Sequence, residues 1–165
     1  MLIRSTIFSA IVITLSLTTS AEEKIPDTID FYGTTAENGC LAKSLAQLRE
    51  STYAAAGEHN PALAWSLVQA VVCGKSRKTN KFLLRHMPRK LQTTSFATGN
   101  LKESYSLVNR SNASFFGGRA WGVTVESGAT TLSVNAQTNE ACVGSVTLTH
   151  YLQSWLITAY SDACD

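Results

Sequence analysis

Three histidines supply the side chains of this 165-residue chain that titrate near neutral pH: His59, His86 and His150. His86 falls inside a basic stretch, where an acid/base acting on an anionic substrate could work. Neither a G-x-S-x-G elbow nor an H-E-x-x-H pair is present. We therefore treat His86 and His150 as weak catalytic candidates, and we expect no cofactor.

Lysine and arginine are concentrated in the middle of the chain. The formal net charge is only +2, but residues 59–119 carry ten Lys or Arg against one acid, and residues 22–58 and 120–165 are each −4. Such segregation predicts contact with an anionic partner. The candidate binding residues in the densest part are Lys75, Arg77, Lys78, Lys81, Arg85, Arg89 and Lys90.

The spacing within this basic group fits a helix. Residues 79–87 are expected to form a short third helix, on which Lys78, Lys81 and Arg85 share one face. An acidic protein surface is the partner that we expect, with another anionic macromolecule as the broader class. Nucleic acid is disfavoured, because Phe82 is the sole aromatic residue in the stripe. The alternative is a solvated helix face that pairs with the molecule's own acids.

A second contact candidate follows a Gly-Gly pair. Arg119 and Trp121 combine a cation with an aromatic ring, a combination typical of interface residues. Burial of Trp121 in the core is the alternative. Just before this stretch, Asn109 and Asn112 begin N-x-S sequons, which a eukaryotic secretory pathway could glycosylate.

The N-terminus has the pattern of a secretory signal. Arg4 precedes an apolar stretch at residues 7–17, which is too short to span a membrane, and small residues end at Ala21. We expect residues 1–21 to be a signal peptide that is cleaved, and residues 22–165 to be a single exported domain. No later apolar run reaches spanning length, so we expect no integral membrane segment and a periplasmic or extracellular location.

All four cysteines follow the expected signal. An even number of cysteines in an exported chain predicts disulfides, here two. Their spacings of 33, 69 and 22 residues do not resemble those of a zinc site, so we expect no metal.

Two helices with a short connection are predicted early in the chain. Apolar residues repeat at helical spacing over residues 36–56, and Pro61 opens a second helix that Gly74 ends. In an antiparallel hairpin, Cys40 near the start of the first helix lies level with Cys73 near the end of the second. We therefore predict a Cys40–Cys73 disulfide.

Cys142 and Cys164 are then left to form the second disulfide.

Apolar and polar residues alternate with period two over residues 120–126 and 131–135, which predicts an antiparallel hairpin. Residues 145–160 are ambiguous: their apolar spacing favours a C-terminal helix slightly, and a strand pair is the alternative. No glycine, asparagine or proline is present to make a tight turn there.

The predicted fold class is α+β: a disulfide-linked helical hairpin and a short third helix, then a small antiparallel sheet with a C-terminal helix. The predicted function is that of a small exported binding protein, specifically an inhibitor or immunity-type partner of an exported enzyme or toxin. The alternative is a small exported hydrolase that acts on an anionic substrate. We expect a binding protein rather than an enzyme.

Overall fold

A computed structural model describes residues 39–97, 99–107 and 115–164 of the chain. Its three helices are α1 (Ala42–Ala56), α2 (Pro61–Cys73) and α3 (Arg77–Arg85). Its six strands are β1 (Lys90–Ala97), β2 (Asn100–Leu107), β3 (Trp121–Ser127), β4 (Thr131–Asn139), β5 (Cys142–Tyr151) and β6 (Ser154–Cys164).

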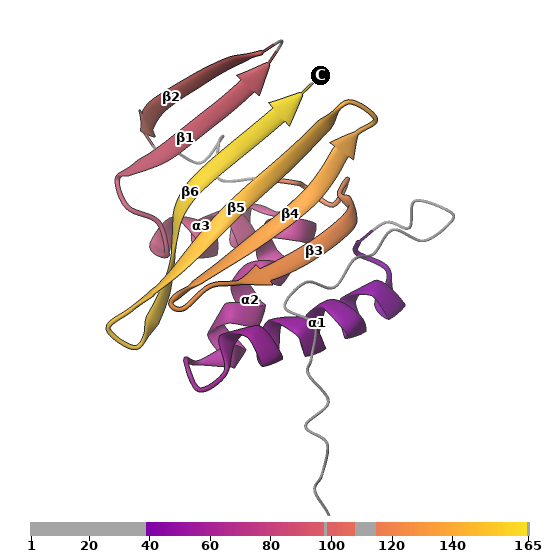
Figure 1. Cartoon of the computed structure of the whole chain (residues 1–165). Helices are drawn as coiled ribbons and strands as arrows, with labels where there is room; N and C mark the ends of the chain where they lie inside the picture. The colour runs from indigo at the N-terminus through magenta and orange to yellow at the C-terminus, as the bar shows by residue number, and fades with distance from the viewer. Residues whose placement is uncertain (1–38, 98, 108–114, 165) are drawn as a thin grey trace, which may run out of the picture.

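The strands form one mixed sheet in the order β2-β1-β6-β5-β4-β3. All neighbours are antiparallel except β1 and β6, which are parallel. Figure 1 shows the three helices on one face of this sheet, with the β1–β2 hairpin at one edge. The chain is therefore α+β as predicted, with a sheet that is larger than expected and not purely antiparallel.

The core lies between the helices and the inner face of the sheet. Burial alternates along β4 and β5, as expected for strands with one covered face. The largest fully buried side chains come from both layers and include Leu48, Leu67, Leu83, Leu132, Leu148, Trp155 and Ile157.

The predicted helical hairpin is confirmed, but the predicted start of its first helix is wrong: residues 39–41 form a turn, and α1 begins at Ala42, so Cys40 lies just before the helix. Asn60 caps α2, since its side-chain oxygen accepts a hydrogen bond from the backbone N–H of Leu63 at 3.2 Å. Pro61 takes the first helical position, and Gly74 ends the helix. A disulfide joins Cys40 to Cys73 with a Cα–Cα distance of 5.6 Å.

The third helix begins two residues earlier than predicted, at Arg77, and ends at Arg85. Ser76 explains the earlier start. Its hydroxyl accepts a hydrogen bond from the backbone N–H of Thr79 at 3.1 Å, which makes Ser76 the cap residue.

The prediction of a C-terminal helix over residues 145–160 is wrong. These residues belong to the β5–β6 hairpin, whose far end is closed by the predicted Cys142–Cys164 disulfide. The turn between the strands is Leu152-Gln153, and both residues have positive φ angles, 44° and 66°. The sequence disfavoured this turn because it contains no Gly, Asn or Pro, the residues that tight turns favour. Pairing along both strands, which is interrupted by one register shift between Thr147 and Leu148, overrides that local preference.

Strand β1 and its pairing were also not anticipated. Lys90–Ala97 is rich in hydroxyls and is paired with β2 on one side and β6 on the other. A parallel pairing across more than sixty residues leaves no local sequence signal.

Some predictions fall outside the described residues. These are the signal peptide at residues 1–21 and the sequons at Asn109 and Asn112. Within the part of the chain that is described, no helix has the length and apolar character that crossing a membrane requires.

Candidate functional site

Seven of the predicted binding residues form an exposed group on and around α3, which we call the basic surface. Each of the seven side chains is exposed to solvent. Within residues 39–97, 99–107 and 115–164, none of them forms an ion pair with an acid. The basic surface consists of Lys75, Arg77, Lys78, Lys81, Arg85, Arg89 and Lys90.

The inner side of α3 fixes how these cations are presented. Leu83 is fully buried in the core, so residues on the opposite side of this short helix face solvent. Gly74 allows the start of α3 to lie close to the end of α2. A Cβ at this position would collide with the carbonyl oxygen of Ala70 and the side chain of Thr79.

The first turn of α3 carries cations and no acid. Arg77 and Lys78 occupy its first two positions, where the helix dipole already places partial positive charge. Each cation there costs stability, on the order of 0.3–1 kcal/mol, instead of contributing it. The first turn of α3 is thus electrostatically suited to an anion and poorly suited to stabilising the helix.

The predicted Arg119 lies next to the same region. The backbone N–H of Gly118 donates to the carbonyl of Val72 at 2.8 Å, which satisfies one of the last carbonyls of α2. The side chain of Lys75 reaches the space beside Gly118. Arg119, the next residue, is exposed and extends the region of positive charge beyond α3.

Trp121 has a different environment. It is half-buried in β3, and its indole N–H donates to the side-chain oxygen of Gln137 in β4 at 2.7 Å. This contact supports strand pairing at the edge of the sheet.

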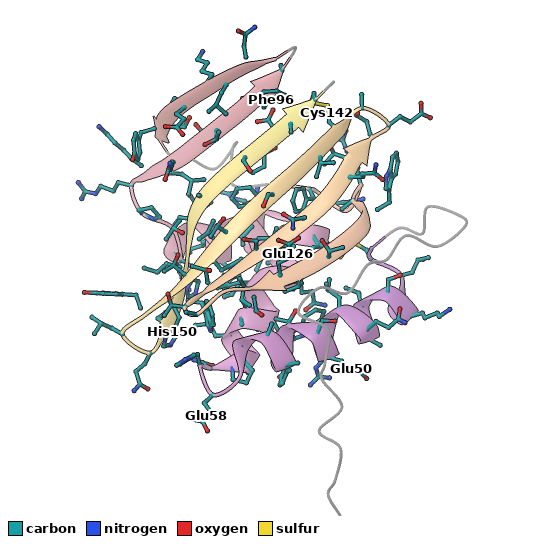
Figure 2. The ribbon with its side chains drawn as sticks, viewed as in Figure 1. Glu50, Glu58, Phe96, Glu126, Cys142 and His150 are labelled. Carbon is teal, nitrogen blue, oxygen red and sulfur yellow. A yellow bond between two sulfur atoms is a disulfide. The ribbon has the colours of Figure 1, made fainter. Side chains whose placement is uncertain are left out.

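The histidines fall into two separate clusters. The ring of His86 packs at a tilt against that of Phe82, with ring centroids 4.9 Å apart, beside the basic surface. His150 lies in the second cluster, near the end of the hairpin where Figure 2 labels it close to the α1–α2 turn.

In the second cluster, His59 and His150 stack at 4.4 Å, a pairing that sequence reasoning missed. The ring of Trp155 packs at a tilt against that of His150, with centroids 5.2 Å apart, and its indole N–H donates to the backbone carbonyl of His59. Among the described residues, no carboxylate or hydroxyl hydrogen-bonds to the ring of any histidine. The rings therefore pack the α1–α2 turn against the sheet.

An open groove of about 660 Å³ runs between α2 and α3, directly beside the basic surface. Sequence reasoning could not find it, because it depends on how two helices are placed. The residues that matter for its chemistry are Ser66, Gln69 and Cys73 from α2 and Lys78, Thr79 and Phe82 from α3.

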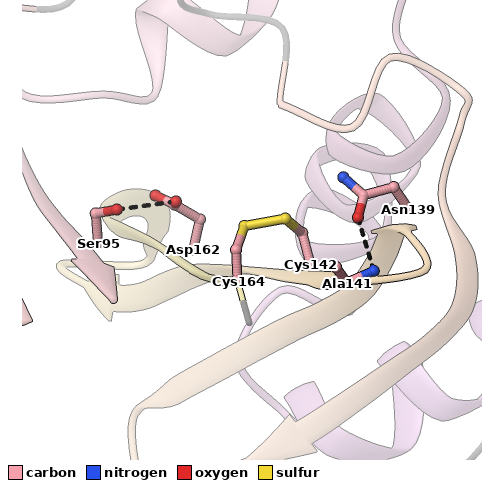
Figure 3. Close-up of a disulfide and its surroundings, with 6 residues drawn as sticks. All are labelled: Ser95, Asn139, Ala141, Cys142, Asp162 and Cys164. Atoms are coloured by element: carbon pink, nitrogen blue, oxygen red, sulfur yellow. Dashed lines mark hydrogen bonds between the residues drawn. A yellow bond between two sulfur atoms is a disulfide. The ribbon is translucent and has the colours of Figure 1, made fainter. Parts of the chain in front are cut away.

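A polar cluster lies at the other end of the sheet, near the second disulfide (Figure 3). The hydroxyl of Ser95 in β1 donates to the carboxylate of Asp162 in β6 at 3.0 Å. Burial, and then the nearby charge of Asp162, raise the pKa of Tyr160 above its usual value of 10.0. The ring of Phe115 lies 5.7 Å from that of Tyr160.

No group of three or more His, Cys, Asp or Glu side chains among the described residues could hold a metal ion. All four cysteines are in disulfides. The described part of the molecule thus offers a basic surface and an adjoining groove as its most distinctive site.

Comparisons with known proteins leave the function open. No known protein family matches the sequence, and no curated protein matches it. A solved structure of an NTF-2 like protein of unknown function from Silicibacter pomeroyi is similar over 63% of this chain and 91% of that chain. The TM-score of this comparison is 0.38 and the sequence identity is 15%.

Proposed function

We propose that this chain is an exported, disulfide-stabilised binding protein whose basic surface binds an acidic surface on another protein. An inhibitor or immunity-type partner of an exported enzyme or toxin would act in this way. The observation that supports the proposal is the basic surface itself: seven exposed cations that form no ion pair with the described residues.

The positions of these cations favour a role in binding over a role in stability. Like charges that are crowded together repel one another, and Arg77 and Lys78 also oppose the dipole of α3. A sequence shaped by stability alone would place an acid in this turn. A partner with carboxylates would relieve both costs and would be steered to the site through long-range attraction.

Export is part of the proposal. The N-terminal sequence has the order of a secretory signal, and the two disulfides are consistent with an oxidising compartment. The alternative of a hydrolase keeps His86 and His150 as its candidates. No observation on the described residues favours it over binding.

Charge reversal on α3 tests the proposal. In the variant Lys78→Glu/Lys81→Glu/Arg85→Glu, we expect partner association to slow by about 10- to 1,000-fold, because the steering charge changes sign. The matched control is Lys43→Glu/Arg49→Glu/Lys102→Glu, which has the same net charge but leaves the basic surface intact.

The measurement is capture from an extract of exported proteins on immobilised wild type and both variants, followed by mass spectrometry. We expect an acidic protein that wild type and control retain, that the α3 variant loses, and that about 0.5 M salt releases. If the α3 variant captures the same proteins as wild type in the same amounts, the basic surface is not the binding site.

A further inference from the structure

The groove between α2 and α3 adjoins the basic surface and shares Lys78 with it. Its interior is formed in part by Cys73 of the disulfide and by the ring of Phe82, both of which are half-buried against the core. Its rim carries Ser66 and Gln69, which are exposed and uncharged. The groove is thus open to solvent and combines apolar surface, chiefly from Cys73 and Phe82, with polar side chains and one cation.

The groove is held in shape before any partner arrives. The Cys40–Cys73 disulfide fixes the end of α2, and the close approach at Gly74 fixes the start of α3. The cap hydrogen bond from Thr79 to Ser76 holds the first turn of α3. A preformed site loses little entropy on binding, and its volume of about 660 Å³ lies within the usual range for ligand pockets.

We propose that this groove receives an apolar side chain, an aromatic one above all, from the acidic segment that binds the basic surface. The inference rests on the proposed function and adds what anchors the partner. Carboxylates on the partner would face Lys78 and Lys81, while the apolar side chain between them would bury against Phe82.

Charge complementarity, together with the apolar surface that Cys73 and Phe82 add to the groove, favours a polypeptide as the occupant. Acidic peptides carry carboxylates and apolar side chains on one chain, whereas acidic polysaccharides have no apolar side chain to place in the groove. Binding of single-stranded nucleic acid uses several rings for base stacking, whereas Phe82 is the one aromatic ring that lines this groove among the described residues. Recognition of acidic motifs by clusters of cations is a recurring peptide-binding mode.

Two fluorescein-labelled synthetic peptides test the anchor. One is a repeat of Glu and Gly, and the other is identical except that one central Gly is replaced by Phe. Fluorescence anisotropy with the full chain should show that the Phe peptide binds about tenfold more tightly, because a ring leaves water. Equal affinities would overturn the inference and leave the proposed function standing. If neither peptide binds, both fail.

A groove-filling variant gives the second arm. Gln69→Trp places a ring over the groove without changing charge, and it should reduce the affinity for the Phe peptide to that for the Glu–Gly peptide. Ala62→Trp is the matched control, because Ala62 is exposed on the same helix about 10 Å away and does not line the groove. A Gln69→Trp protein that still prefers the Phe peptide tenfold would contradict the inference.

The chain's own acidic residues are the rival occupant. A variant with Gln or Asn in place of Glu22, Glu23, Asp27, Asp30 and Glu37 should give the same amide NMR shifts as wild type at Gln69, Thr79 and Phe82. Shifts that differ without any peptide would assign the groove to residues 22–37 and overturn the proposal of an external partner.

Discussion

Lys78 is a residue whose position lowers the stability of the fold. It is exposed at the second position of α3, where an acid would be favourable and a cation is not. Lys43 occupies the equivalent second position in α1 and is not part of the basic surface. The two lysines thus have the same electrostatic setting within a helix but different surroundings.

Lys78→Glu should therefore stabilise the protein while it weakens partner binding. We expect about 0.5–2 kcal/mol of added stability in urea unfolding, from removing a repulsion and adding an attraction. Lys43→Glu should give a similar gain with partner binding unchanged. A Lys78→Glu protein with normal binding would show that this cation does not contact the partner.

The turn between β5 and β6 is strained at two residues. Leu152 and Gln153 both have positive φ angles, and Leu152 is 78% exposed, so burial does not compensate for its conformation. A left-handed conformation costs an ordinary L-residue roughly 1–2 kcal/mol. The favoured residues for such a turn are Asn and Gly.

Leu152→Asn/Gln153→Gly should therefore raise the free energy of unfolding by about 1–2 kcal/mol. Thermal and urea unfolding would measure the gain. A loss of stability would mean that Leu152 makes a contact that outweighs the strain of the turn.

At the scale of elements, local signals predicted the helices and failed for part of the sheet. Asn60-Pro61 and Gly74 marked both ends of α2 correctly, because capping needs only neighbouring residues. The parallel pairing of β1 with β6 joins distant segments and has no such signal. Residues 145–160 satisfy both a helical and a strand pattern, and pairing with neighbouring strands decides between them.

The two disulfides stabilise different elements, although both close loops of similar length. Cys40–Cys73 fixes the end of α2 to the residues just before α1, whereas Cys142–Cys164 closes the β5–β6 hairpin. Loop entropy assigns each about 3–4 kcal/mol. Only the first one also helps to hold the candidate site.

Removing each disulfide separately should show this difference. Cys40→Ala/Cys73→Ala should lower both stability and partner affinity, and Cys142→Ala/Cys164→Ala should lower stability while affinity stays within about twofold. Affinity would be measured at a temperature where both variants remain folded by circular dichroism. Equal losses of affinity would mean that the site does not depend on the end of α2.

At the scale of the whole molecule, the near-neutral total charge conceals a basic middle segment. The sequence alone was sufficient to predict which cations are close together, because they lie within sixteen residues and partly on one helix. It could not predict the groove, which two helices form jointly, or the extension of positive charge toward Arg119. That extension depends on the hydrogen bond from the backbone N–H of Gly118 to the carbonyl of Val72 near the end of α2.

The central claim is that an acidic partner binds at the basic surface and not elsewhere. Amide NMR shifts of the full chain, titrated with a poly-glutamate peptide at low salt, test this claim directly. We expect the shifts to be confined to residues 75–90 and 115–119 and to disappear at about 0.5 M salt. Shifts centred on His59 and His150, or spread over the open face of the sheet, would contradict the claim.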